Sequence, residues 1–210
     1  MPENKKEALA RFHRENILRA AEKLFLEKGI ENTTMDNIAK EAQYSKATIY
    51  VYYKNKEELI SSITLLSMKL YLTHITEAVS KNSDIYRQYY DLCYSLADFY
   101  KDYPLYYECM LKEINVDIEL AETPPVYKEI YEVGEEINKV IEAMLERGIK
   151  DGYIRSNIPV IETVFLLWAG ISGIINMAVE KEKYLSKYFS ITKDAFLKDG
   201  FDMLLKSIIK

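Results

Sequence analysis

The side chains that are best suited to bind a partner lie in one short segment. If residues 45–52 form a helix, its outward face presents Lys46, Thr48, Tyr50, Val51 and Tyr52. Lysine and hydroxyl groups donate hydrogen bonds to phosphate oxygens, and short side chains can reach base edges and thymine methyl groups in the major groove. We expect Ala47 and Ile49 to face inward, and Tyr53 to pack at the end of the helix rather than to bind. The segment therefore indicates a surface that contacts duplex nucleic acid.

The charge distribution supports a polyanion partner at one end of the chain. The 210 residues have a net charge of −5, but residues 40–56 contain four lysines and one glutamate. Residues 1–60 carry a net charge of +1 and the rest a net charge of −6. A small basic patch on an acidic body is typical of a protein that contacts nucleic acid at one end.

Helix signals surround this segment. An apolar stripe predicts a first helix over residues 7–28, which Gly29 ends. The segment Thr33-Thr34-Met35-Asp36 offers a capping hydroxyl and an acid for the start of a short helix over residues 35–42, and Ser45 caps the next helix. Two short helices joined by a tight turn predict a helix-turn-helix.

The rest of the chain reads as long helices. With 7 Gly and 5 Pro, the sequence has too few turn residues for a sandwich, a barrel or a doubly wound sheet. Six further helices are predicted over residues 55–80, 85–101, 105–120, 126–149, 159–184 and 192–209. The expected fold is all-α with nine helices, divided into a DNA-binding domain (residues 1–55) and a ligand-binding and dimerisation domain (residues 56–210).

Residues 10–60 closely resemble the amino-terminal domain of TetR-family transcriptional regulators. Two segments carry the resemblance, Gly29–Ala42 (GIENTTMDNIAKEA) and Ser45–Leu59 (SKATIYVYYKNKEEL). The resemblance implies a TetR-like architecture, with Thr34 and Lys56 as DNA-backbone clamps. Gln43 departs from the family pattern, which usually has glycine there, and a left-handed turn at this residue would cost about 1 kcal/mol. We predict DNA contacts at Thr34, Ser45, Lys46, Ala47, Thr48, Tyr50, Tyr52 and Lys56.

The resemblance also implies that the second domain binds a small molecule. The chain contains 18 tyrosines, many of them on the central helices. A tyrosine combines an apolar ring with a hydroxyl that seeks a partner when buried, which suits a largely apolar cavity with a few polar points. We predict ligand contacts at Tyr86, Tyr89, Tyr90, Cys93, Tyr94, Tyr106, Met110, Glu113, Tyr131 and Trp168. Taken singly, each tyrosine is also consistent with a place at the edge of the core, and both a cationic aromatic ligand and a neutral fatty one remain open.

The two helices predicted over residues 159–184 and 192–209 have more apolar surface than packing within one chain would bury. Residues 163–179 are free of charge and contain Gly170, Ser172 and Gly173, which permit close approach of another helix. A run of 17 residues is at the short limit for a membrane span, and burial between protein surfaces explains it better. We expect a second copy of the chain to cover these helices, giving a homodimer with no membrane partner.

Other chemistry has little support in the sequence. His74 and Glu77 supply only two of the ligands that a closed metal site needs, and Cys93 and Cys109 have no chelating spacing. No phosphate-binding glycine loop or nucleophile motif occurs, and no cofactor is expected. The lack of candidate catalytic residues predicts that the protein is not an enzyme. Two cysteines and no apolar leader predict a cytoplasmic protein.

The sequence therefore favours a homodimeric repressor that a small hydrophobic or aromatic ligand releases from a palindromic operator. Two alternatives stay open. One is a helical enzyme or small-molecule carrier without specific DNA binding. The other is a transcriptional activator with the same DNA-binding domain.

Overall fold

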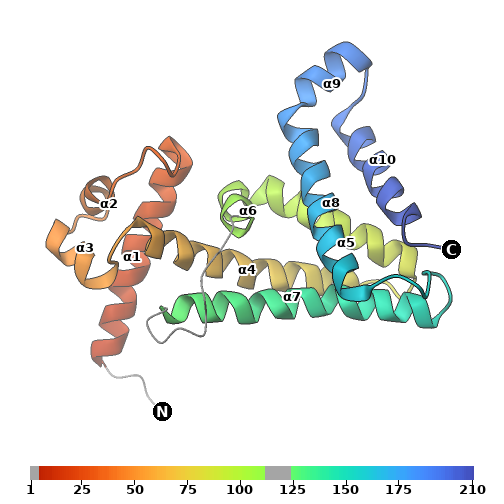
Figure 1. The fold of residues 1–210 in the computed structure, drawn as a ribbon. Helices are drawn as coiled ribbons and strands as arrows, with labels where there is room; N and C mark the ends of the chain where they lie inside the picture. Colours follow the sequence, from red (N-terminus) through yellow and green to blue (C-terminus); the bar gives the residue numbers. More distant parts are fainter. Residues whose placement is uncertain (1–4, 112–123) are drawn as a thin grey trace. The chain divides into compact units, whose positions relative to one another are not determined.

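The structure is a computed structural model in which residues 5–111 and 124–210 are described. These residues form ten helices and, apart from one isolated bridge between Ile154 and Ile209, no β-structure (Figure 1). The helices are α1 (Lys5–Lys28), α2 (Met35–Glu41), α3 (Lys46–Tyr52), α4 (Lys56–Ser80), α5 (Ile85–Asp102), α6 (Pro104–Met110), α7 (Pro125–Lys150), α8 (Val160–Glu180), α9 (Glu182–Phe189) and α10 (Lys193–Lys206). The all-α prediction is confirmed.

The described residues form one helix more than the nine predicted, because the chain breaks after Glu180. The sequence predicted one helix from Pro159 to Tyr184, but Lys181 has φ −105° and ψ 9°, which ends α8. A separate helix, α9, then begins at Glu182. Neither glycine nor proline marks the break, so no local signal predicted it. The predicted helix over residues 105–120 begins as α6, and its part from Lys112 onward lies outside the described residues.

The chain divides into two compact units. The head unit comprises Met1–Lys69 and Tyr103–Glu132, and the body unit comprises Leu70–Asp102 and Val133–Lys210. Helices α4 and α7 each contribute residues to both units. The functional boundary after residue 55 stays a prediction.

The head unit is built around the inner faces of α1, α2 and α3. Its core includes Ile17 and Phe25 from α1, Ile38 from α2 and Ile49 from α3. Gly29 has φ 82° directly after α1, a left-handed conformation that glycine adopts without strain and that lets the chain turn sharply. Tight packing around Ile49 holds α3 in a fixed orientation on the bundle.

In the body unit, α8 and α10 pack closely because glycines lie at their contacts. A Cβ atom placed on Gly170 of α8 would come within 2.8 Å of Leu204 Cδ1. A Cβ on Gly200 of α10 would come equally close to Ile174 Cγ2. Helix α5 also packs against this pair, and the Tyr89 hydroxyl donates to the carbonyl of Phe201 at 2.9 Å.

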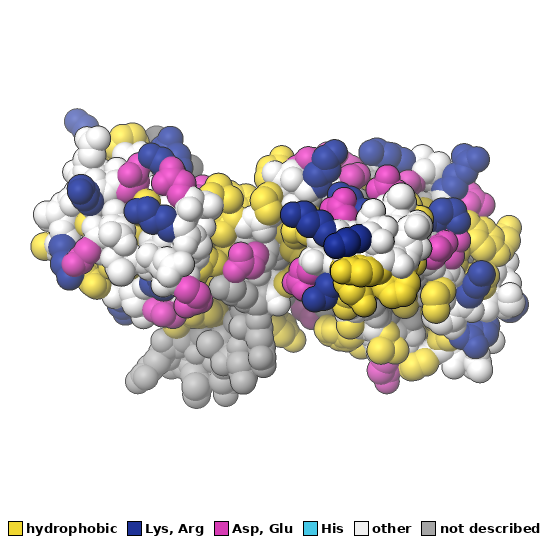
Figure 2. Space-filling view, turned by 90° about the horizontal axis from the view of Figure 1, so that it is seen from above, with side chains coloured by type: hydrophobic (Ala, Val, Ile, Leu, Met, Phe, Trp, Pro, Cys, Tyr) yellow, Lys and Arg dark blue, Asp and Glu magenta, His cyan; other side chains and the backbone are white. Residues whose placement is uncertain are grey.

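Helix α8 keeps much of its apolar surface uncovered. Among the helices in the described ranges, it is the one with the length and composition to cross a membrane, yet only 28% of its most apolar window is buried. Phe165 and Leu166 are 56% and 67% exposed, and Met203 of α10 is 72% exposed. Figure 2 shows hydrophobic side chains gathered beside lysine and arginine side chains on one face of the body unit. The same composition is found in core helices of soluble proteins, so length and apolarity alone do not assign α8 to a membrane.

Candidate nucleic-acid interface

The start of α3 is fixed by its N-cap residue. Ser45 has extended backbone angles, and its Oγ accepts a hydrogen bond from the Thr48 amide at 3.1 Å. The two hydroxyls of Ser45 and Thr48 also lie 2.8 Å apart. At the other end, Tyr53 is buried, as expected. Capping and burial together hold the seven residues of α3 as a defined helix.

The outward face of α3 presents most of the predicted contact residues. Lys46, Ala47 and Tyr50 are exposed, and Thr48 and Tyr52 are half-buried. Val51 is also exposed, at 75%. The expectation that Ala47 faces inward was wrong. The helix has only seven residues and Ile49 is the only one of them that is buried, so its inner face does not extend to Ala47.

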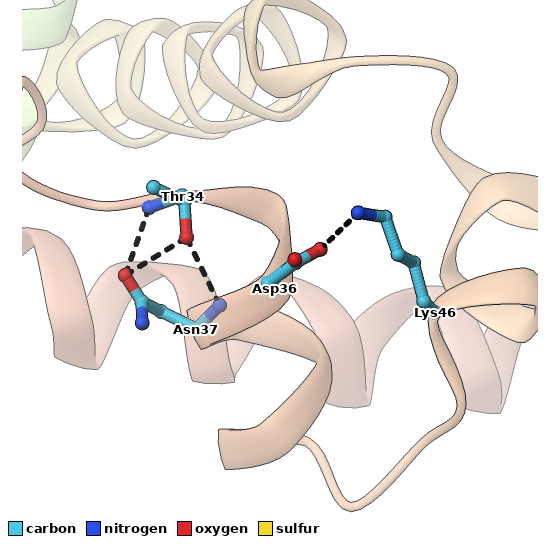
Figure 3. Close-up of polar contacts among 4 residues, drawn as sticks. All are labelled: Thr34, Asp36, Asn37 and Lys46. Carbon is cyan, nitrogen blue, oxygen red and sulfur yellow. Dashed lines mark hydrogen bonds and ion pairs between the residues drawn. The ribbon is translucent and has the colours of Figure 1, made fainter.

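Lys46 is held by an acidic residue of the neighbouring helix. Its Nζ lies 2.6 Å from Oδ1 of Asp36, in the first turn of α2 (Figure 3). Hydrogen bonding and charge attraction from Asp36 raise the pKa of Lys46, so the ammonium stays charged at neutral pH. Both side chains are exposed, so the pair remains accessible to a competing anion.

Thr34 caps α2. Its Oγ1 accepts from the Asn37 amide at 3.2 Å, and its own amide donates to Oδ1 of Asn37 at 3.1 Å, which completes a capping box (Figure 3). The Thr34 side chain therefore satisfies a helix-terminal amide that would otherwise be free to bind an anion. Its role as a DNA-backbone clamp stays a prediction.

Lys56 opens α4 and reaches back across the head unit. Its Nζ donates to the carbonyl of Ile30 at 2.9 Å. Asn55, just before it, caps the helix by accepting from the Glu58 amide at 2.8 Å. Lys56 thus connects α4 to the loop before α2, and its contact with DNA phosphate stays a prediction.

His13, which the sequence analysis missed, links α1 to the turn between α2 and α3 and to α3 itself. Its Nδ1 lies 2.6 Å from the Tyr44 hydroxyl, in the turn between α2 and α3. Its ring centroid is 5.4 Å from that of Tyr52 on α3. The residue lies one turn before Ile17, on the stripe of α1 that faces the core. That position was a readable signal that His13 packs inward.

The turn between α2 and α3 has the strained conformation anticipated at Gln43. Its φ of 59° is in the left-handed region, where a side chain is unfavourable. The Tyr44 amide donates to the Ala39 carbonyl at 2.9 Å and closes the turn. Glycine is absent from this position, so the surrounding packing must impose the turn.

The predicted ligand contacts fall in both units. In the head unit, the Tyr106 hydroxyl donates to Oε1 of Glu22 at 2.8 Å, Met110 is half-buried and Tyr131 is exposed. Burial, followed by the bond to Glu22, raises the pKa of Tyr106. Glu113 lies outside the described residues.

The body unit brings four of the predicted residues together on α5, next to α10. Tyr89 is buried and bonded to Phe201, and the Tyr90 hydroxyl donates to Asp202 at 2.5 Å. That bond and burial raise the pKa of Tyr90 to about 12. Cys93 is buried, which raises its pKa to about 12, and the Tyr94 ring meets the Phe201 ring at 5.4 Å. These partners on α10 could not be read from the spacing within α5.

The two remaining body residues lie elsewhere in that unit. The Tyr86 ring stands edge-on to Tyr153, with centroids 5.9 Å apart. Trp168 on α8 donates from Nε1 to Oδ1 of Asn138 on α7 at 3.2 Å, and its ring lies 5.6 Å from Tyr71. The role of all these residues in ligand binding stays a prediction.

Known proteins resemble this chain most clearly in the helix-turn-helix of the head unit. Residues 17–63, which include α2 and α3, match the family model described as bacterial regulatory proteins of the tetR family. The uncharacterized HTH-type transcriptional regulator YhgD of Bacillus subtilis is 32% identical over 139 residues, which span 66% of this chain and 70% of YhgD.

Solved structures extend the likeness of fold to nearly the whole chain. The TetR-family regulator PfmR of Thermus thermophilus aligns with a TM-score of 0.65 and 22% identity, over 92% of this chain and 95% of that one. FadR of Bacillus subtilis, solved in complex with stearoyl-CoA, aligns with a TM-score of 0.68 and 18% identity, over 92% and 98%. The exposed helix-turn-helix and these likenesses together show that the chain belongs to the TetR family and is a DNA-binding transcriptional regulator.

Proposed function

We propose that the protein is a homodimeric repressor, released from a palindromic operator by a small hydrophobic or aromatic ligand. The observation that carries the DNA-binding part is the outward face of α3, where Lys46, Ala47 and Tyr50 are exposed and Thr48 and Tyr52 are half-buried. In this proposal Lys46 binds a phosphate and Tyr50 reaches the bases or the sugar-phosphate edge. Ser45, Thr34 and Lys56 hold the ends of the helices against the backbone of the duplex.

The dimer proposal rests on the uncovered apolar surface of α8 and α10. Phe165, Leu166 and Met203 are each more than half exposed, and Gly173 has no atom within 4 Å of the position of a Cβ. Monomeric proteins rarely leave a large contiguous apolar patch open to water. A second copy that packs its own α8 and α10 against this pair would form a four-helix interface with two-fold symmetry. Two α3 helices would then read half-sites about 34 Å apart, or a multiple of that spacing.

The ligand proposal draws on the tyrosine-rich helices and on the relatives. FadR of Bacillus subtilis, which shares the fold, was solved with stearoyl-CoA bound. An apolar effector of this chain would contact Tyr94, Trp168 and neighbouring aromatic rings and compete with their present packing partners. A ligand can shift the protein between two states only by its difference in affinity for them. To change the ratio of the two states from 1:99 to 99:1, a ligand must bind one state about 10⁴-fold more tightly than the other, which corresponds to roughly 5.5 kcal/mol.

Helix α4 is the route by which we propose that the ligand changes the spacing of the two α3 helices. It begins at Lys56, bonded to Ile30 of the head, and its last turns belong to the body unit. A shift of the later part of a continuous helix changes the orientation of its start. In this mechanism the ligand favours a state whose two α3 helices do not match the operator spacing.

A footprint on the DNA that flanks the protein's own gene, repeated with candidate hydrophobic compounds, tests the proposal. We expect a protected palindrome and loss of protection with an effective compound. Protection together with increased transcription would indicate an activator instead. No protected site, with binding that does not change with salt concentration, would favour the carrier or enzyme alternative, because phosphate contacts make DNA affinity fall steeply with salt.

A further inference from the structure

The body unit has a pocket that combines cationic, uncharged polar and apolar lining residues and contains no tyrosine. It has a volume of about 630 Å³ and lies where the end of α4 and the α4–α5 turn meet α7. Ser80, Lys81, Asn82 and Ser83 form the side made by the turn, and Met144 and Arg147 belong to the side made by α7. None of the predicted ligand contacts lines it.

The charge of this pocket is opposite to that of the protein around it. Residues 61–210 carry a net charge of −6. The pocket, in contrast, is lined by the two cationic side chains Lys81 and Arg147, and none of its described lining residues is acidic. In the described part of the chain, neither cation has an ion-pair partner. Two unpaired cations in one concave site favour an anionic ligand.

Gln88 supplies a second, independent indication of a ligand. It lines the pocket, is 2% exposed, and donates both Nε2 hydrogens, to the carbonyls of Val79 at 2.8 Å and Asn82 at 2.6 Å. These two bonds fix the orientation of the amide. Its Oε1 is therefore an acceptor, and it is buried without a hydrogen-bond partner in the described structure. Buried polar atoms almost always have a hydrogen-bond partner, so we expect a ligand to supply a donor to this oxygen.

We propose that this pocket binds a small organic carboxylate that also carries a hydrogen-bond donor. The carboxylate pairs with Arg147 and Lys81, and the donor, a hydroxyl or an amide N–H, bonds to Gln88 Oε1. The apolar part of the ligand packs against Val79, Val140 and Met144, which complete the lining. This site is separate from the proposed effector contacts on the tyrosine-rich helices, and it does not depend on DNA binding.

Isothermal titration calorimetry of the full-length protein with three matched probes tests the assignment. The probe 3-hydroxybenzoate has the anion, the donor and an apolar ring, benzoate lacks the donor, and phenol lacks the anion. We expect 3-hydroxybenzoate to bind at least tenfold more tightly than either of the other two. The reason is that losing one well-formed polar contact lowers the affinity about tenfold. No measurable binding of 3-hydroxybenzoate, or equal affinity for 3-hydroxybenzoate and benzoate, would overturn the proposal.

Variants place the binding in this pocket. Arg147→Gln should weaken 3-hydroxybenzoate about tenfold, whereas Lys150→Gln, which removes the same charge one turn further along α7 and outside the lining, should leave it unchanged. Gln88→Met keeps the size of the side chain but removes the acceptor, so it should abolish the preference for 3-hydroxybenzoate over benzoate. Circular dichroism checks that this buried variant folds. An Arg147→Gln protein that binds like the wild type would contradict the site, whatever the outcome at Gln88.

Discussion

Lys46 Nζ on α3 lies 2.6 Å from Asp36 Oδ1 on α2, so the cation that we propose binds a DNA phosphate is already paired with a carboxylate. A phosphate that binds Lys46 must compete with Asp36. The carboxylate itself stands beside the proposed DNA surface and repels the phosphate backbone. We therefore expect the pair to hold the lysine in place and at the same time to weaken the binding of DNA.

Asp36→Asn should bind DNA several-fold more tightly, because it frees Lys46 and removes a negative charge from the interface. The same variant should lose no more than about 1 kcal/mol of stability, since an exposed ion pair contributes little and the acid in the first turn of α2 adds a modest helix-dipole term. Electrophoretic mobility shifts and urea unfolding measure the two effects.

Glu41→Gln is the matched control for Asp36→Asn. Glu41 also belongs to α2, but it pairs with Lys23 of α1 at 2.5 Å rather than with a residue of α3. Loss of its charge should change DNA affinity much less. If both variants tighten binding equally, the effect is one of net charge, and the specific role of the Asp36–Lys46 pair is wrong.

Gln43→Gly should stabilise the protein by about 0.5–1 kcal/mol. Gln43 has φ 59°, and glycine adopts this conformation without the Cβ clash, although its greater freedom in the unfolded chain offsets part of the gain. Chemical denaturation measures the difference. Gln43→Ala retains a Cβ and should not stabilise, so an equal gain in both variants would rule out relief of backbone strain.

The elements that local signals specify were predictable, and the contacts between distant elements were not. Thr34, Ser45 and Gly29 mark helix ends through their own backbone and hydroxyl chemistry, so the helix-turn-helix could be placed from the sequence. The break at Lys181 has no such marker. The bond between Tyr90 and Asp202 joins residues 112 positions apart, which no spacing within one helix indicates. Interactions of that kind depend on how whole helices pack.

The Tyr90–Asp202 bond predicts a stability difference that depends on pH. The pKa of Tyr90 is raised to about 12 from an ordinary value near 10, so the folded state holds this proton more tightly than the unfolded state. Its contribution is complete below pH 10 and decreases as the pH rises toward 12. Wild type should exceed Tyr90→Phe by about 1–2 kcal/mol at pH 8 and by less at pH 11. Unfolding titrations at both values measure this, and a difference that is constant between them would exclude the bond as its source.

Leu166→Asp should convert the dimer to monomers. Leu166 is 67% exposed on α8, where we propose that the second copy packs, and a buried unpaired carboxylate strongly opposes association. Leu26 of α1 is 62% exposed and offers the control, because Leu26→Asp introduces the same charge outside the proposed interface. Sedimentation equilibrium distinguishes the two. A dimer that persists in Leu166→Asp, or a wild-type protein that sediments as a monomer, would refute this interface.

The salt dependence of DNA affinity for wild type and for Lys46→Ala is the most direct test of the claim that α3 enters the DNA groove. Each lost phosphate contact reduces the slope of log affinity against log salt by about 0.9. A dimer that loses Lys46 from both copies should therefore show a slope smaller by about two, weaker binding and an unchanged fold, whereas Lys150→Ala should resemble wild type. An unchanged slope and affinity in Lys46→Ala would contradict the account.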